Sequence, residues 1–173
     1  MLAGGCYHGT ARSVTLADLG TAQSWERVAG VPEIRQVARE DCGAAALAMV
    51  LGYWRIPIER DEIAAASAPG PARGIRAVDL RDVARRQGLQ AFVIEGRFDD
   101  LERELRRHHP VVVGMMKRYA QRAYPHYEVV VGIDRAQQRV LTLDPASGLR
   151  VNSREGFSAE WAAAHQVALV VFP

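Results

Sequence analysis

The apolar residues of this chain change their spacing once, and that change limits the folds that the chain can adopt. Between residues 41 and 87 they recur at the three- and four-residue intervals of buried helices. From residue 89 onward, short runs rich in valine and leucine predict strands, with two short helices between them. Helices that precede strands indicate an α+β fold, here with N-terminal helices packed on a mostly antiparallel C-terminal sheet.

The expected elements follow from this pattern and from the Gly and Pro residues that interrupt it. Helices are predicted at residues 41–56, 59–66, 76–87, 99–107 and 158–164, and strands at 89–95, 111–116, 127–133, 139–143 and 167–172. Asp41 and Ser158 are candidate N-caps of two of these helices. We expect residues 117–125 to form a basic loop and residues 134–138 to connect a hairpin.

Length and composition fit one domain without a membrane-spanning helix. The 173 residues are 49% hydrophobic, which is enough for the core of one domain. We expect that domain at residues 31–173, behind an N-terminal extension at residues 1–30. The net charge of +2 does not indicate a nucleic-acid-binding surface, so no nucleic-acid partner is expected. No apolar run approaches the roughly 20 residues of a membrane helix.

The two cysteines, Cys6 and Cys42, form neither a metal-binding motif nor a disulfide framework, so we expect no metal and no cofactor. Small residues precede Cys6, as in the lipobox of bacterial lipoproteins, but the charged and apolar regions of a signal peptide are absent. Two interpretations remain open. Cys6 is either a lipid anchor, which would hold the protein at a membrane in the bacterial periplasm, or part of a glycine-rich tail of a cytoplasmic protein.

Cys42 stands where a loop is predicted to turn into a helix. Asp41 and Gly43 flank it, and an alanine-rich apolar run follows. The unpaired N–H groups and the dipole of a helix N-terminus stabilise a thiolate, and the thiolate is the nucleophilic form of cysteine. The position therefore predicts a reactive thiol.

A nearby imidazole would complete the activation of this thiol, and His126 is the best placed of five histidines. It begins a predicted strand, whereas the other four lie in the tail or near helix ends and fit surface or capping roles. Asp144 ends the neighbouring predicted strand, and antiparallel pairing brings these two strand ends together. There Asp144 would accept a hydrogen bond from the imidazole and fix its tautomer. The alternative is that residues 144–148 form only a turn, and both interpretations can hold.

Attack on an amide carbonyl produces an oxyanion, which requires N–H donors placed in advance. The backbone N–H of Cys42 and the side-chain amide of Gln36, six residues earlier, are the candidates. Gly43 and two tyrosines of the expected basic loop, Tyr119 and Tyr124, are candidate contacts to a substrate. The alternative for that loop is a solvated basic surface.

Together these residues resemble the bacteriocin-processing cysteine peptidases of the papain-like clan. Those peptidases occur as N-terminal domains of peptide-exporting ABC transporters and cut leader peptides after a double glycine. The resemblance extends from about residue 32 to the C-terminus, and it rests on Gln36, residues 41–49, residues 126–132 and Asp144-Pro145.

This resemblance implies a papain-like fold and a role for each residue. Cys42 is then the nucleophile, His126 the general base and acid, Asp144 the residue that orients His126, and Gln36 the oxyanion donor. No transporter sequence follows residue 173, so we expect a stand-alone form.

Three functions remain open at this stage. The first is a cysteine peptidase that cuts peptide bonds after small residues such as Gly-Gly, through an acyl-thioenzyme. The second is a papain-like module that binds a peptide without cutting it, and the third is an acyl transferase or amidase with the same thioester chemistry. The expected partners are a peptide or protein substrate and an export system encoded nearby.

Overall fold

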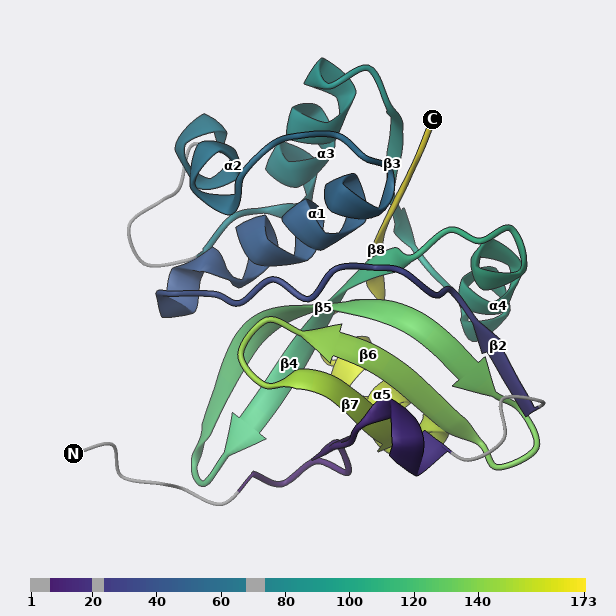
Figure 1. The fold of residues 1–173 in the computed structure, drawn as a ribbon. Coiled ribbons are helices and arrows are strands. Elements are labelled where there is room, and N and C mark those ends of the chain that lie inside the picture. Colours follow the sequence, from purple (N-terminus) through teal and green to yellow (C-terminus); the bar gives the residue numbers. More distant parts are fainter. Residues whose placement is uncertain (1–6, 20–23, 68–73) are drawn as a thin grey trace.

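The computed structural model describes residues 7–19, 24–67 and 74–173. Within these residues, five α-helices pack on an eight-stranded sheet whose strand pairs are all antiparallel (Figure 1). The strand order is β1-β7-β6-β5-β4-β8-β3, and β2 pairs with β5 off this path. The prediction of an α+β fold is therefore confirmed.

The helices are α1 (Cys42–Tyr53), α2 (Arg60–Ala66), α3 (Ala77–Arg86), α4 (Phe98–Arg106) and α5 (Arg154–Ala162). The strands are β1 (Arg12–Ser13), β2 (Trp25–Arg27), β3 (Gln90–Glu95), β4 (Val111–Tyr119), β5 (Arg122–Asp134), β6 (Arg139–Asp144), β7 (Gly148–Ser153) and β8 (Val167–Phe172). The residues that the structure describes also form the 3-10 turns η1 (Leu16–Leu19) and η3 (Arg39–Asp41).

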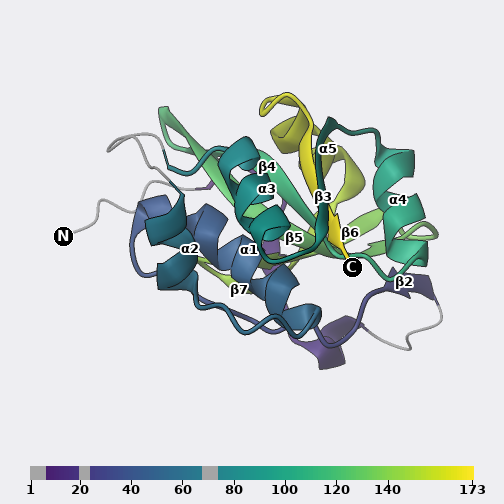
Figure 2. The ribbon, with the colours of Figure 1, turned by 90° about the horizontal axis from the view of Figure 1, so that it is seen from above.

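Both faces of the sheet are covered by helices. Figures 1 and 2 show α1, α2 and α3 grouped apart from α4 and α5. Successive residues of a strand point to opposite faces, so Val112 of β4 packs in the core on the α1 side, while Val111 and Val113 pack in the core on the α5 side. Two buried faces explain why β4 and β5 contain unbroken apolar runs.

The central helix is α1, in which every residue from Cys42 to Leu51 is buried. A helix that is apolar on all sides belongs inside a protein, and its alanines let neighbouring elements approach closely. Asp41 precedes this helix but does not cap it, so that prediction was wrong. Its Oδ2 atom instead accepts a hydrogen bond from the Ala38 backbone N–H at 3.0 Å and closes η3.

The basic loop expected at residues 117–125 is instead a β-hairpin. β4 continues to Tyr119, and β5 begins at Arg122 after a tight turn in which Ala120 has a φ of 50°. The adjacent charges Lys117 and Arg118 had indicated an exposed loop. In the structure Lys117 is buried beside carboxylates, whereas Arg118 on the opposite face of the strand is exposed.

The chain after Asp144 also departs from the prediction. Strand β7 was missed because Arg150 and Asn152, both polar, occupy buried positions in it. The N-cap of α5 is Ser153, whose side chain accepts a hydrogen bond from Gly156 N–H at 3.0 Å, and not Ser158. The helix therefore begins four residues earlier than predicted.

The described part of residues 1–30 packs on the sheet, since β1 pairs with β7 and β2 pairs with β5. The boundary at residue 30 stays a prediction. Cys6, the candidate lipid anchor, lies outside the described residues. In the ranges that the structure describes, no helix combines the length and apolar character that crossing a membrane requires.

Candidate active site

Cys42 is the first residue of α1 and follows η3 directly. Cys42 is 6% exposed, and within the described residues its thiol forms no disulfide. The Asp41 carboxylate accepts its hydrogen bond within η3, so no described side chain caps the first turn of α1. The N–H groups of that turn therefore remain available to a ligand near the sulfur.

His126 links Cys42 to Asp144. It lies on β5 opposite Met115 of β4, and its side chain is 13% exposed. The Nε2 atom lies 2.7 Å from Asp144 Oδ1, and the ring lies close enough to Cys42 for the two groups to interact. Since Asp144 occupies Nε2, Nδ1 is the ring nitrogen left for the sulfur. The structure thus brings together the cysteine, histidine and aspartate that the sequence singled out.

Asp144 ends β6 and begins the turn to β7. Its Oδ1 atom also accepts a hydrogen bond from Ala146 N–H at 2.8 Å, and its Oδ2 atom lies 3.5 Å from Arg150 Nη1. The residue is 3% exposed. Asp144 is therefore both a turn residue and a partner of His126, as the two interpretations of the sequence allowed together.

Opposite charges stabilise one another in this pair. Burial lowers the pKa of His126, but the hydrogen bonds with Asp144 and Cys42 outweigh burial and raise that pKa from 6.5 to about 10. Burial raises the pKa of Asp144, whereas the hydrogen bond and charge of His126, the Ala146 N–H and the charge of Lys117 lower it to about 2. At neutral pH the site therefore contains an imidazolium and a carboxylate.

Gln36 is tied to the turn that carries Asp144. Its backbone N–H donates to Pro145 O at 3.1 Å, and its side-chain Nε2 donates to Ala38 O at 3.1 Å. The Oε1 atom is buried without a hydrogen-bond partner in the described part of the chain. A primary amide has two N–H bonds, so one stays available after the bond to Ala38. The role of Gln36 as an oxyanion donor stays a prediction.

Gly43 has a packing role in the structure. A Cβ atom at this position would lie 3.2 Å from Leu80 Cδ1 of α3 and 3.2 Å from Tyr127 Cδ2 of β5. Such contacts are tighter than ordinary van der Waals distance, so glycine permits the close approach of α1 to both elements. A contact between Gly43 and substrate stays a prediction.

Tyr119 and Tyr124 lie at the end of the β4–β5 hairpin, with ring centroids 6.3 Å apart. The guanidinium carbon of Arg39, three residues before Cys42, lies 3.6 Å from the centroid of the Tyr124 ring. This contact connects the hairpin end to the loop that leads into α1. Contacts of the two tyrosines with substrate also stay predictions.

Several charged residues that lie behind His126 and Asp144 were not identified from the sequence. Arg150 contacts Asp144, and Lys117 forms buried ion pairs with Glu128 and Glu160. One signal was present in the sequence, because Glu128 interrupts an apolar strand two residues after His126. A charge in a strand that is buried on both faces implies a buried partner.

The family model that matches this chain is the Peptidase C39 family, over residues 31–173. The chain belongs to the Peptidase C39 family. It is therefore a papain-like cysteine peptidase. Within the described residues, Cys42 is the cysteine that lies at the start of a helix and beside a histidine. No curated protein matches the chain.

Solved structures share the fold of this C39 peptidase. A double glycine motif protease from an AMS/PCAT transporter, in complex with its leader peptide, is 23% identical, with a TM-score of 0.67 over 85% of this chain and 94% of that one. A C39-like peptidase from Bacillus anthracis is 18% identical, with a TM-score of 0.70 over 85% and 96%. The peptidase domain of Streptococcus ComA, a bifunctional ABC transporter of a quorum-sensing pathway, is 22% identical, with a TM-score of 0.67 over 83% and 99%.

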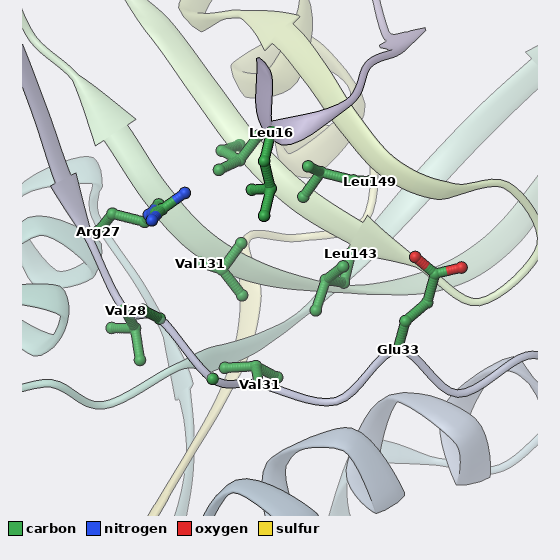
Figure 3. A pocket seen from close by; sticks show the side chains of 11 residues that line it. Leu16, Arg27, Val28, Val31, Glu33, Val131, Leu143 and Leu149 are labelled. Carbon is green, nitrogen blue, oxygen red and sulfur yellow. The ribbon is translucent and has the colours of Figure 1, made fainter. Parts of the chain in front are cut away.

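An apolar pocket adjoins the strand that carries Asp144 in this C39 peptidase. It has a volume of about 230 Å³ and lies between η1, residues 27–33 and strands β5 to β7 (Figure 3). Leu16, Val131 and Leu143 are among the aliphatic side chains around it, and Leu143 immediately precedes Asp144. Such a pocket suits one aliphatic side chain of a ligand.

Proposed function

We propose that this C39 peptidase cuts a leader peptide after a pair of small residues such as Gly-Gly. The observation that carries the proposal is that the His126 ring is hydrogen-bonded to Asp144 and lies beside Cys42 at the start of α1. A related fold was solved with a leader peptide bound to a double glycine motif protease, which supports the same substrate class here. An export system that supplies such peptides is part of this proposal.

In the proposed reaction, Cys42 Sγ attacks the carbonyl carbon of the scissile bond, and the electron pair of the C=O bond moves to oxygen. The backbone N–H of Cys42 and the Gln36 amide stabilise that oxyanion. The C–N bond then breaks as His126 gives its proton to the leaving amine nitrogen. The product of this half-reaction is a thioester on Cys42.

Water completes the reaction. His126, now neutral, removes a proton from a water molecule as its oxygen attacks the thioester carbon. The C–S bond breaks, the N-terminal fragment leaves with a free carboxyl group, and the imidazolium is restored beside the thiolate. Asp144 accepts a hydrogen bond from Nε2 throughout, which keeps Nδ1 directed at the sulfur.

The surroundings of the site support a peptide substrate. The edge formed by Tyr119, Tyr124 and Arg39 offers aromatic and cationic contacts to an extended or helical segment. Glycines at the cleavage site would allow a peptide backbone to approach Cys42 closely, since they carry no Cβ atom.

The test compares cleavage of a peptide that contains Gly-Gly with cleavage of versions in which Val replaces either glycine. We expect cleavage after Gly-Gly, weaker cleavage of the Val versions, and loss of turnover in Cys42→Ala and His126→Ala. Cys6→Ala is the matched control and keeps full activity. Cleavage by Cys42→Ala at the wild-type rate would contradict the assignment of the nucleophile.

The place of the protein in the cell is also a proposal. The small residues before Cys6 support a lipid anchor and hence a periplasmic site of action at a membrane. The alternative is a cytoplasmic protein with an unmodified Cys6. Intact mass spectrometry of protein from the producing cell separates the two, because a lipidated Cys6 adds the mass of its acyl chains.

A further inference from the structure

A buried group of charges lies behind the pair formed by His126 and Asp144. Lys117 of β4, Glu128 of β5 and Glu160 of α5 are 4%, 0% and 8% exposed. Lys117 Nζ lies 2.5 Å from Glu128 Oε1 and 2.7 Å from Glu160 Oε2. Removing charges from water is costly unless they are paired, so these three groups hold one another in place.

This group reaches the catalytic pair through Glu128. Glu128 follows His126 by two residues on β5, so both side chains lie on the same face of the sheet. A ring nitrogen of His126 and one carboxylate oxygen each of Glu128 and Asp144 lie within 4.8 Å of one another. Two carboxylates so close repel each other, and their cationic partners therefore decide whether both stay ionised.

Each carboxylate has a cation of its own. Lys117 pairs with Glu128, and Arg150 Nη1 lies 3.5 Å from Asp144 Oδ2. Arg150 is 8% exposed, and its Nη2 atom donates to the backbone carbonyl of Ala11 at 2.5 Å. A residue of the N-terminal segment thus fixes the cation that faces Asp144.

The same N-terminal segment also contacts the lysine group. Tyr7 Oη donates a hydrogen bond to Glu160 Oε1 at 2.5 Å. The centroid of its ring lies 5.6 Å from Lys117 Nζ and 5.3 Å from Arg150 Cζ. Tyr7 therefore lies within reach of both cations, and its ring face is available to them.

The segment is anchored on each side of these contacts. His8 N–H donates to Arg118 O at 3.0 Å near the β4–β5 hairpin, and Arg12 and Ser13 pair with β7 as strand β1. In Figure 1 the segment runs along the edge of the sheet at β7. It lies outside residues 31–173, which the family model matches.

We propose that residues 7–13 position the catalytic pair of this peptidase. Tyr7 steadies Glu160 and with it Lys117, while the carbonyl of Ala11 steadies Arg150. The two cations keep Asp144 ionised and aligned with His126. The proposal rests on the function proposed above, and it makes Tyr7 and Arg150 positioning residues for the reaction.

The titratable and charged groups around Asp144 and its partners come from several elements. They are Cys42 of α1 beside His126, His126 and Glu128 of β5, Lys117 of β4, Arg150 of β7 and Glu160 of α5. Weakening either cation lets the nearby carboxylates raise the pKa of Asp144. The acid limb of the activity profile then moves to higher pH.

The test uses point variants of the full chain with a Gly-Gly peptide as substrate. Tyr7→Phe keeps the ring and removes the hydrogen bond to Glu160, and Arg150→Met removes the cation beside Asp144. We expect kcat to fall about 3-fold in Tyr7→Phe and about 10-fold in Arg150→Met, with KM nearly unchanged. In both variants the acid limb of kcat/KM against pH shifts upward, and Arg150→Lys restores most of that shift.

Tyr53→Phe is the matched control. Tyr53 ends α1 at the end opposite Cys42, so the same chemical change there leaves kcat, KM and the pH profile unchanged. The proposal is overturned if Tyr7→Phe matches wild type in kcat and pH profile. It is also overturned if Tyr7→Phe and Arg150→Met lose activity only in proportion to lost folded protein, with an unshifted acid limb. Turnover by Cys42→Ala would instead refute the proposed function itself, whatever these variants do.

Discussion

Each oxygen of the Asp144 carboxylate has a defined partner. Oδ1 accepts hydrogen bonds from His126 and from the Ala146 N–H, and Oδ2 faces Arg150. Because the carboxylate is ionised, it stabilises the imidazolium and fixes the direction of the ring. At the scale of single residues, one negative charge thus determines where the proton of His126 is held.

Asp144→Asn tests this role of the charge. The amide oxygen keeps the acceptor for His126, but the charge that raises the pKa of His126 is lost. We expect kcat to fall about 100-fold or more with KM nearly unchanged, and the thermal unfolding midpoint to fall as well, because the buried ion pair loses one of its charges. Steady-state kinetics and circular dichroism check this, and a kcat within twofold of wild type would contradict it.

The three residues at the centre of the site were predictable because each stands where its element begins or turns. Cys42 follows a loop and opens an alanine-rich helix, and Asp144 precedes a proline in a turn. Lys117 was not recognised as buried, because its partners Glu128 and Glu160 are 11 and 43 residues away in sequence. Sequence patterns report burial through apolar residues, and a neutralised buried lysine gives no such signal.

At the scale of elements, the turn between β6 and β7 holds Asp144 in place. Gly148 ends this turn with a φ of 81°, a left-handed conformation that residues with a Cβ atom adopt only with strain. A Cβ atom there would also lie 2.7 Å from Arg35 Nη2 and 2.9 Å from Glu33 Oε1. The turn therefore requires glycine for its backbone, whereas the exposed ends of the Arg35 and Glu33 side chains can move to make room.

Gly148→Ala is expected to cost about 1–2 kcal/mol of unfolding free energy from the left-handed backbone alone. It should also lower kcat, because the turn that carries Asp144 must shift. Gly88→Ala is the matched control, since Gly88 has a φ of 83° and open space around it at the end of α3. Urea unfolding and peptide cleavage would show similar stability losses but reduced kcat only in Gly148→Ala. Equal kcat in the two variants would refute the link between this turn and the site.

The helices and most strands were predictable because their apolar periods are clear, as in α3 and β8. The β4–β5 hairpin and β7 were not, because charged or polar residues occupy inward positions in both. Those inward charges belong to the network around the active site. The prediction from sequence therefore failed mainly where the fold accommodates charged groups near the site.

At the scale of the whole molecule, the ionised pair links folding to pH. The pKa of His126 rises from 6.5 to about 10 on folding, so its contribution to stability is complete below pH 6.5 and is lost as the pH rises through about 10. The pKa of Asp144 falls from 3.8 to about 2, so its contribution is present above pH 3.8 and is lost as the pH falls through about 2.

Wild-type protein should therefore lose unfolding free energy between pH 7 and pH 10, and His126→Gln should lose less over the same interval. Urea unfolding at pH 7, 8.5 and 10 measures both slopes. The difference between the two proteins isolates His126 from the lysines and tyrosines that also titrate at high pH. Parallel slopes would show that His126 has no raised pKa in the folded protein.

The central claim is that Cys42 is the nucleophile of a peptidase that accepts Gly-Gly at its cleavage site. The most direct measurement is mass spectrometry of the protein after treatment with a peptide that ends in a Gly-Gly chloromethyl ketone. The account predicts one adduct, on Cys42 and not on Cys6, with peptidase activity lost in proportion to labelling. Activity that persists in fully labelled protein, or inhibition with the adduct on another residue, would contradict it.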